Sequence, residues 1–339
     1  MSTLVPRREF LKRLAGAGAV AAGGIGVARL IRGDGPVRWD ERAFAPPGAA
    51  HVAVVRAPRY DDSLLEELVL DGLRTVQADV AGARVLLKPN IVEFDPGTAI
   101  NTDPRLVAAT VNAIRRLGAR SVMVAEGPGH RRDTIGLVMT SGLGEALHSV
   151  EAPFTDLNSD IVVPVELRSR YTDLGRVWLP RSVVDADVIV SMPKMKTHHW
   201  VGITLSLKNL FGCLPGRIYG YPKNVLHWSG ITGSILDLAG AIRPSLAIVD
   251  GITAMEDDGP INGTPVDAGL LVFSDDPVAA DAVTAGLMGY DLDEVPYLGE
   301  AGRFLGQIEP DRIEQRGEAP ADLARIFVRP PDSEASTAG

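Results

Sequence analysis

The chain contains almost no cysteine: Cys213 is the only one in 339 residues. A single cysteine can neither build a disulfide framework nor supply the ligands of an iron–sulfur cluster within one chain, so no such cluster is expected. Its expected role is that of a lone buried thiol. Apolar residues make up 45% of the sequence, which is ample for a packed core.

The chain also lacks an excess of positive charge. Its formal net charge is −9, and no basic face with interleaved aromatic residues is present. This balance argues against a nucleic-acid-binding protein. It is compatible with a small anionic ligand, because the charge of a binding site is local.

Long apolar runs are missing as well. The stretch from Leu14 to Ala28 is weakly apolar and glycine-rich, and it is short for a membrane span of about 20 residues. It follows Arg7-Arg8-Glu9-Phe10-Leu11-Lys12, which resembles the twin-arginine export motif R-R-x-F-L-K. We therefore expect residues 1–32 to be a signal for the twin-arginine translocase, and the protein to be exported to the periplasm or another extracytoplasmic space.

The fate of this signal stays open on the sequence. No clean A-x-A cleavage site precedes a permissive residue, so removal of the signal and its retention as a weak membrane anchor are both compatible with the chain. Residues 33–50 are rich in glycine, proline and alanine and are expected to be a linker. Because the twin-arginine route carries folded proteins, often with an inserted cofactor, it favours a bound cofactor.

The remainder of the chain alternates strands with helices. Short apolar runs predict strands at 51–56, 84–88, 121–125, 188–190, 246–250 and 269–273. Capped or amphipathic segments predict helices at 63–73, 104–117, 136–149, 232–242 and 281–288. This order predicts an α/β fold with a mostly parallel sheet and helices on both faces. We expect two lobes, 51–150 and 151–329, and a disordered tail at 330–339.

The densest group of polar side chains follows the strand at 188–190. Lysines, histidines, hydroxyls and an amide are interleaved there with Trp200, Val201 and several aliphatic residues. Such interleaving is typical of a ligand pocket, and the alternative is a lysine-bearing surface loop. The residues expected to bind substrate or act in catalysis are Lys194, Lys196, Thr197, His198, Lys208 and Asn209.

Polar residues also follow the other predicted strands. Because the carboxyl ends of parallel strands meet at one edge of a sheet, these residues are expected to join the same site. Glycines after a strand let a ligand approach the backbone closely, although this segment is not a G-x-G-x-x-G dinucleotide motif. The residues concerned are Lys88, Asn90, Glu126, Gly127, Gly129, His130 and Asp250.

Several of these segments resemble those of a known family. Lys88-Pro89-Asn90, the run from Ala125 to Gly129, the run from Pro193 to His198, the run from Leu207 to Gly212 and Val249-Asp250-Gly251 are similar to the signature segments of the DUF362 family. The resemblance covers roughly residues 51–308. Some members add a ferredoxin-like cluster domain, whose cysteines this chain lacks. Membership by itself implies no particular reaction.

A more distant resemblance is to the nickel-pincer lactate racemase superfamily. The segment from Val122 to Arg131 is similar to its strand–Gly–x–His–Arg segment, and His198, Gly202, Lys208 and Pro215-Gly216 match its H-x-x-x-G…K…P-G pattern. The resemblance implies that Lys208 covalently carries a pincer holding nickel, with His227 as a metal ligand. It implies His130 and His198 as the acid/base pair. The chain departs from the superfamily at Thr204–Leu207, where a glycine-rich run is expected, and at Lys88-Pro89-Asn90.

Three functions are compatible with these patterns. The first is an enzyme on a small carboxylate or phosphate, of the racemase or epimerase type, with a metal or a lysine-linked metal cofactor. The second is an exported binding protein for a small anion or metal complex, without catalysis. The third places Glu126, Asp250 and Glu256 around a hard cation such as Mg²⁺, which prefers oxygen ligands. The acidic residues at 256–258 could equally form a solvated turn.

Overall fold

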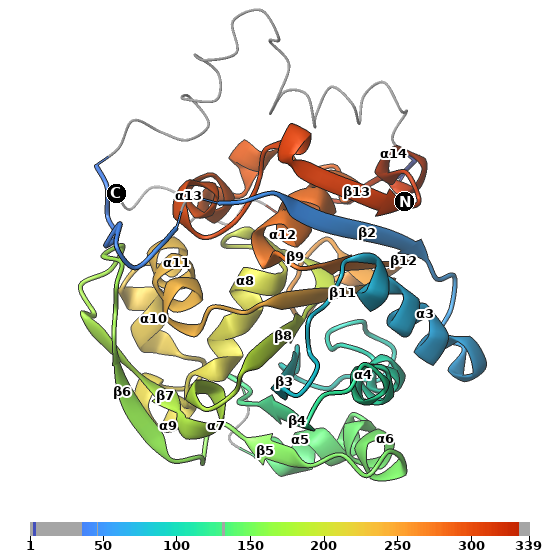
Figure 1. Ribbon diagram of the computed structural model, residues 1–339, viewed down its shortest axis with the longest axis horizontal. Coiled ribbons are helices and arrows are strands. Elements are labelled where there is room, and N and C mark those ends of the chain that lie inside the picture. Colours follow the sequence, from blue (N-terminus) through green and yellow to red (C-terminus); the bar gives the residue numbers. More distant parts are fainter. Residues whose placement is uncertain (1–2, 5–35, 46, 131–132, 332–339) are drawn as a thin grey trace, which may run out of the picture.

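The structure is a computed structural model that describes residues 3–4, 36–45, 47–130 and 133–331 (Figure 1). Apart from Thr3 and Leu4, the predicted signal at 1–32 lies outside the described residues. So do residues 33–35 of the predicted linker and residues 332–339 of the predicted tail. Within the described part, no helix combines the length and apolar character needed to cross a bilayer.

A ten-stranded sheet forms the centre of the molecule. Its main path runs in the order β13-β2-β12-β11-β8-β3-β4-β5, and β9 and β10 extend it beside β11. Most neighbouring strands are parallel, which confirms the predicted α/β class. The strands of this sheet are β2 (Ala50–Arg56), β3 (Arg84–Pro89), β4 (Ser121–Glu126), β5 (Phe154–Asp156), β8 (Val188–Met192), β9 (Lys194–His198), β10 (Gly202–Thr204), β11 (Leu246–Glu256), β12 (Thr264–Ser274) and β13 (Ile313–Gly317).

Two smaller pairings lie apart from this sheet. β6 (Val162–Glu166) pairs with β7 (Arg176–Pro180), and β1 (Thr3–Leu4) pairs with β14 (Arg325–Ile326). Strands from both predicted lobes, 51–150 and 151–329, share the ten-stranded sheet. The division into lobes at residue 150 stays a prediction.

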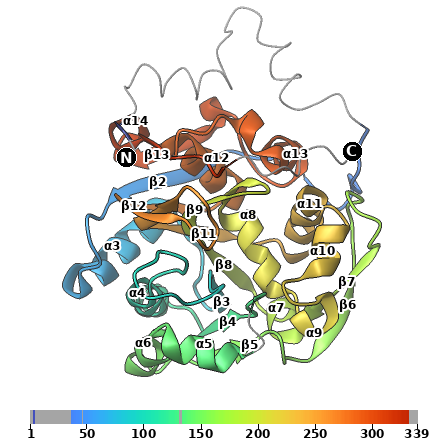
Figure 2. The same ribbon diagram turned by 180° about the vertical axis from the view of Figure 1, so that it is seen from behind.

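Helices cover both faces of the sheet (Figures 1 and 2). Successive strand residues point to opposite faces, so Leu87 packs with one helical layer and Leu86 with the other. One layer contains α3 (Asp62–Thr75), α4 (Pro104–Arg116), α5 (Thr134–Thr140) and α6 (Leu143–Ser149). The other contains α8 (Ser206–Asn209), η1 (Leu210–Cys213), α10 (Asn224–Trp228), α11 (Ile231–Ile242), α12 (Pro277–Leu287) and α13 (Pro296–Phe304).

Short helices complete the connections. They are α7 (Arg181–Val184), α9 (Gly216–Tyr219), η2 (Leu292–Glu294), η3 (Pro310–Arg312) and α14 (Pro320–Leu323). The helix predicted at 136–149 is two helices, α5 and α6, because Gly142 between them has a φ of 79° and interrupts the helical path. Cys213 is buried as predicted, and burial raises the pKa of its thiol to about 12, so the thiol stays protonated and unreactive.

The structure corrects the prediction around residues 246–273. The predicted strands there are longer, and β11 and β12 form an antiparallel hairpin. Only residues 257–263 separate the two strands, which is too short for a parallel crossover. Glu256 therefore lies in β11 rather than in an acidic loop, and its carboxylate accepts the backbone N–H of Val328.

Residues 194–198 form a further strand, β9, which was not predicted beyond the strand at 188–190. Pro193 ends β8, and β9 continues the path by pairing with β11. The two-residue period of a strand places the side chains of Lys196 and His198 on the same side of β9. Both line the cavity described next.

Candidate functional site

A cavity of about 120 Å³ opens at the carboxyl ends of β3 and β4. It is smaller than the pockets of about 300–1,000 Å³ that hold drug-sized ligands, so it suits a compact ligand. Ten of its lining residues were predicted for the site, namely Lys88, Asn90, Glu126, Gly129, His130, Lys196, His198, Lys208, Asn209 and His227. The others are Ile91, Val92, Thr204, Phe211, Gly212, Pro222, Lys223 and Pro260.

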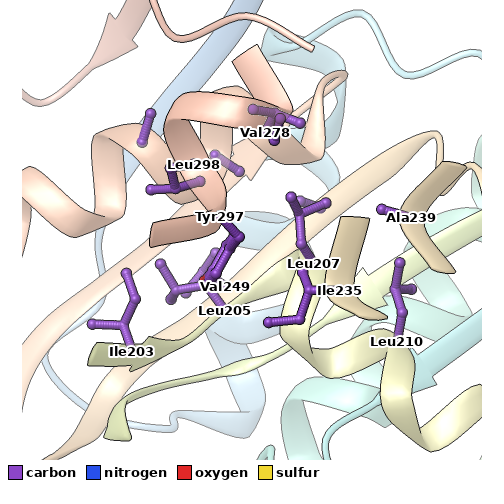
Figure 3. Close-up of a cluster of buried hydrophobic side chains, with 14 of the residues drawn as sticks. Ile203, Leu205, Leu207, Leu210, Ile235, Ala239, Val249, Val278, Tyr297 and Leu298 are labelled. Carbon is purple, nitrogen blue, oxygen red and sulfur yellow. The ribbon is translucent and has the colours of Figure 1, made fainter. Parts of the chain in front are cut away.

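The segment 203–210 divides its side chains between the core and the cavity. Ile203, Leu205, Leu207 and Leu210 lie within an apolar cluster beside α11, α12 and α13 (Figure 3). The intervening residues Thr204, Lys208 and Asn209 line the cavity. The interleaved sequence pattern therefore reflects one core side and one cavity side of the same short segment.

A buried carboxylate holds the start of α8 in place. The two side-chain oxygens of Asp281 in α12 accept the backbone N–H groups of Ser206 at 2.7 Å and Leu207 at 3.0 Å. These N–H groups would otherwise be unsatisfied at the first turn of a helix. Asp281 thus fixes the turn that carries Lys208 and Asn209.

Lys88 and Glu126 form a buried ion pair at the floor of the cavity. Lys88 Nζ also donates to Pro89 O at 2.7 Å and to Asn209 Oδ1 at 3.1 Å, so its three protons are all used. Burial raises the pKa of the Glu126 carboxyl, and the Lys88 ammonium opposes that rise. A side chain at Gly212 would overlap both charged groups, which explains the glycine there. Lys88, predicted to bind substrate, is saturated by these contacts, so its Nζ has no proton left for a ligand.

Lys196 and Lys223 project into the cavity from β9 and from the start of α10. Lys196 Nζ donates to Ile100 O at 2.7 Å and to Pro260 O at 3.3 Å, and Lys223 Nζ donates to Leu214 O and to Asn158 Oδ1. An ammonium has three protons, so each lysine has one left for a ligand. Burial lowers the pKa of Lys196 well below its usual range and that of Lys223 to about 8.

Lys208 differs from these lysines. Within the described part of the chain no group accepts a hydrogen bond from its Nζ, which lies 4.1 Å from the centre of the Phe211 ring. Burial, together with the positive charge of Lys88, lowers the pKa of the Lys208 ammonium to about 7. Near neutral pH this side chain is therefore divided between an ammonium ion and a free amine.

The two buried or half-buried histidines of the cavity have opposite hydrogen-bonding roles. His198 Nδ1 accepts the backbone N–H of Trp200 at 3.1 Å, so in the neutral ring the proton is on Nε2. His227 Nδ1 lies 3.1 Å from Lys223 O, which only accepts, so its proton is on Nδ1 and Nε2 has a free lone pair. Burial and the nearby Lys208 lower both pKa values, that of His227 to about 4. At neutral pH, His198 Nε2 is a donor and His227 Nε2 an acceptor.

Two buried polar atoms of the cavity have no partner among the described residues. They are Asn90 Oδ1 and Thr204 Oγ1, on side chains that are 6% and 4% exposed. Buried polar atoms are hydrogen-bonded in almost all native proteins, so each such atom needs an explanation. A ligand that donates to Asn90 and Thr204 provides one.

Four predicted site residues, Lys194, Thr197, Asp250 and Gly127, lie away from the cavity lining. Lys194 Nζ donates to Asp250 Oδ2 at 2.7 Å and to Tyr60 Oη at 2.8 Å, in a buried ion pair. Thr197 Oγ1 donates to Asp257 O at 2.8 Å and holds the loop before β12. Lys194, Thr197 and Asp250 are therefore structural in this arrangement. Gly127 is absent from the lining too, because its N–H donates to Glu126 Oε1.

Lys223 is the most important residue that the sequence reasoning missed. It follows cis-Pro222 and has a φ of 69°, a left-handed conformation that costs energy in a residue other than glycine. A usable signal was present in the composition. The chain has only six lysines against 28 arginines, and four of the six, Lys88, Lys196, Lys208 and Lys223, line this cavity.

The donor set does not form a protein-only metal site. Among the described residues, no three His, Cys, Asp or Glu side chains converge in a way that could hold a metal ion. Glu126 and Asp250, both predicted as metal ligands, are each occupied by a lysine. His227 Nε2 is the predicted ligand atom with an available lone pair.

Comparison with known proteins gives a family and distant structural neighbours. A thylakoid-associated protein of Synechocystis sp. is 30% identical over 276 residues, which cover 75% of this chain and 79% of that protein. The lactate racemase apoprotein of Thermoanaerobacterium thermosaccharolyticum has a TM-score of 0.42 and 13% identity, over 69% of this chain and 55% of the other. A protein from Thermotoga maritima has a TM-score of 0.35 and 12% identity, over 62% and 55%.

The chain thus spans about half the length of both solved structures. The family model described as "Domain of unknown function (DUF362)" matches residues 85–286, a range that begins in β3 and ends in α12 and includes most of the cavity lining. Family membership was predicted from the segments at 88–90, 125–129, 193–198, 207–212 and 249–251, and the match confirms it. This chain belongs to the DUF362 family.

Proposed function

We propose that this protein is an enzyme that binds a small carboxylate or phosphate in the lysine-lined cavity and carries out its chemistry at Lys208. The observation that carries the proposal is Lys208, whose Nζ donates to no acceptor within the described part of the chain and which lines the cavity with three further lysines and one glutamate. Charges of one sign are costly to bury together unless a counter-ion joins them. A bound small anion would remove the cost of burying these like charges together. If the lysines served only a structural role, that cost would remain.

The two histidines give this site a proton acceptor and a hydrogen-bond donor. His227 Nε2 can accept a proton and return it, and His198 Nε2–H can donate a hydrogen bond to a negative charge that develops on the substrate. An acceptor and a donor in one cavity suit the removal and return of a proton at one carbon, the reaction of a racemase or epimerase. This assignment gives the acceptor role to His227 rather than to His130, which is exposed at the cavity wall.

The proposed cofactor is a metal–organic group attached to Lys208. A bare metal ion, including Mg²⁺, fits poorly because the available carboxylates are paired with lysines. A metal that brings its own organic ligands fits better, since Lys208 offers a free amine and His227 Nε2 a nitrogen ligand. When bound, such a group would supply an electron-accepting centre beside the substrate.

We also propose that the protein is exported by the twin-arginine translocase. The support is the Arg7-Arg8-Glu9-Phe10-Leu11-Lys12 segment with the weakly apolar stretch after it. The Synechocystis relative, described as thylakoid-associated, is in keeping with a location at or beyond a membrane. Fractionation of the native host, with Arg7→Lys/Arg8→Lys as the comparison, tests this: an exported wild type and a retained variant are expected.

Anion binding is expected to weaken as pH rises from 7 to 9. The ammonium forms of Lys208 and Lys223 attract the anion, and their pKa values are about 7 and about 8. A bound anion raises both pKa values, so binding takes up protons and the affinity falls by up to about tenfold per pH unit for each linked proton. Calorimetric titration of phosphate and oxalate at pH 6, 7, 8 and 9, each in two buffers of different ionisation enthalpy, measures this. Affinity independent of pH with no proton uptake would contradict it.

The role of His227 separates an enzyme from a binding protein that uses the same cavity. An enzyme that moves a proton exchanges a ligand C–H hydrogen with solvent deuterium, which proton NMR follows. His227→Gln is expected to lower that exchange by about 10²–10⁴-fold, the usual contribution of a general base, with a small change in anion affinity. Ligand binding without exchange in the wild type, across a panel of small hydroxy and oxo acids, would favour the binding protein.

A further inference from the structure

We propose that Lys208 forms an imine with the carbonyl carbon of a small carboxylic acid that bears a ketone or aldehyde group, of which a 2-oxo acid is the simplest. The inference rests on the proposed function, because the cavity must first hold the carboxylate of that acid. It adds the chemical class of the substrate and the bond that Lys208 makes.

The surroundings of Lys208 set it apart as a nucleophile. Lys88 is held by a carboxylate, a carbonyl and an amide oxygen, while Lys196 and Lys223 each donate to two oxygen acceptors. These contacts direct the N–H groups of the three lysines toward protein oxygens. Lys208 Nζ donates no hydrogen bond to any described residue and lies 4.1 Å from the centre of the Phe211 ring. A lysine that is desolvated near other cations is a recognised amine nucleophile, and its pKa of about 7 gives a large fraction of free amine at neutral pH.

The rest of the cavity matches the other groups of an oxo acid. The remaining ammonium protons of Lys196 and Lys223 suit the carboxylate. His198 Nε2–H is a donor for the carbonyl oxygen as negative charge develops on it. Asn90 Oδ1 is an acceptor without a donor, and it suits the hydroxyl group formed when an amine adds to a carbonyl. An oxo acid thus accounts for the unpaired Asn90 Oδ1.

The proposed step is balanced without an oxidant or reductant. The neutral amine of Lys208 attacks the carbonyl carbon, forming a C–N bond while the C=O π electrons move to oxygen. His227 Nε2 accepts a proton from the nitrogen and passes it to the oxygen, to which His198 Nε2–H donates a hydrogen bond. The resulting carbinolamine loses its hydroxyl group as water when His227 transfers the second nitrogen proton to that hydroxyl, which leaves the imine. The sum is amine plus carbonyl giving imine plus water.

An imine at Lys208 and a resident metal–organic group exclude each other in one molecule, since both use the same nitrogen. The mass of the protein isolated from its native host, measured before any addition, decides between them. An unmodified Lys208 is required by the imine proposal. A covalent group already on Lys208 would overturn it while leaving the proposed cofactor in place.

Reductive trapping tests the imine directly. The full-length protein is incubated at pH 7.5 with pyruvate and, separately, glyoxylate in the presence of sodium cyanoborohydride, and modified peptides are mapped by mass spectrometry. We expect one reduced adduct per chain, at Lys208, with more labelling there than at any other lysine, because Lys88, Lys196 and Lys223 each donate hydrogen bonds to oxygen acceptors. Lys194, buried in its ion pair, is an internal control within each molecule.

Lys208→Arg is the matched variant, because arginine keeps the positive charge and cannot form this adduct. It should bind pyruvate in calorimetry and give no adduct at position 208. A wild-type protein that binds pyruvate but yields no adduct, or yields equal labelling on several lysines, overturns the imine and leaves the proposed anion site intact. A folded wild type that neither binds nor is labelled by either acid overturns the imine proposal. If phosphate and oxalate also fail to bind, the proposed anion site is overturned as well.

Discussion

Replacing Lys194 with methionine is expected to lower the free energy of unfolding by about 3–5 kcal/mol, the usual cost of removing one partner of a buried ion pair. Lys194 and Asp250 are 2% and 0% exposed, and their charged atoms are 2.7 Å apart. Without the ammonium, the Asp250 carboxylate would keep only Tyr60 Oη at 2.7 Å and the Asp103 N–H at 2.9 Å as close donors. Urea unfolding followed by circular dichroism measures the loss.

A double variant shows whether the uncompensated charge causes this loss. Lys194→Met/Asp250→Asn removes both charges, keeps an oxygen that can accept the Asp103 N–H, and places an amide NH₂ that can donate to Tyr60 Oη. It should recover part of the stability that Lys194→Met loses. The structural account of this pair would be wrong if Lys194→Met unfolded at the same urea concentration as the wild type.

Replacing Lys208 with methionine is expected to have the opposite sign and to raise the free energy of unfolding at pH 7. The pKa of Lys208 is about 7 when folded and about 10.4 when unfolded, so the unfolded chain binds more protons between these values. Folding at pH 7 thus has to keep the amine partly deprotonated, at a cost of roughly 4 kcal/mol for a fully buried group. Because Lys208 is only partly buried, we expect a gain of about 1–3 kcal/mol from the methionine.

The stability difference between the wild type and Lys208→Met is expected to depend on pH. Because the folded pKa is lowered, the cost is fully present below pH 7 and is relieved as pH rises toward 10.4, so wild-type stability should rise over that window relative to the variant. Urea unfolding at pH 6, 7 and 9 measures the difference. Lys208→Arg is the control, because it retains the charge and should bring no gain. A Lys208→Met variant that is less stable than the wild type at pH 7 would show that the amine is held by contacts rather than kept for a ligand.

The replacements of Lys194 and Lys208 are expected to change stability in opposite directions, yet the local sequence does not distinguish the two lysines. Lys194, Lys196 and Lys208 occur in one short polar segment, and nothing in their spacing separates a structural ion pair from a ligand-binding amine. The difference arises from Asp250, 56 residues away from Lys194, whose side chain reaches Lys194 because β11 pairs with β9. Such a long-range contact is invisible to a reading of local pattern.

The fold was largely predictable because its signals are local. Apolar runs marked the buried parallel strands, and Asp103 before Pro104 marked the start of α4, where its side chain accepts the Arg105 N–H. The antiparallel hairpin of β11 and β12 was not predicted, because the alternation of strands and helices along the chain favours parallel strands joined by crossovers. β9 was missed because Pro193 is a strong strand terminator, and the strand resumes after it against a different neighbour.

The site was predictable to the extent that it follows strand ends. Lys88, Glu126 and Lys196 were found by that rule, and Lys223 was not, because it lies in a loop after cis-Pro222 and is held by Asn158 from a distant segment. Asp281 was missed for a related reason. Its two hydrogen bonds to the start of α8 depend on how α12 packs, which the sequence does not display.

The most direct test of the anion site is a calorimetric titration of pyruvate into the wild type and Lys208→Met at pH 6.5, where most Lys208 side chains are cationic. The account predicts one binding site in the wild type and an affinity reduced by about 10–100-fold in the variant, the expected loss of a hydrogen bond from a charged group. It also predicts proton uptake in the wild type that is smaller in the variant. Equal affinity and equal proton uptake in the two proteins would contradict the claim that Lys208 meets an anion in this cavity.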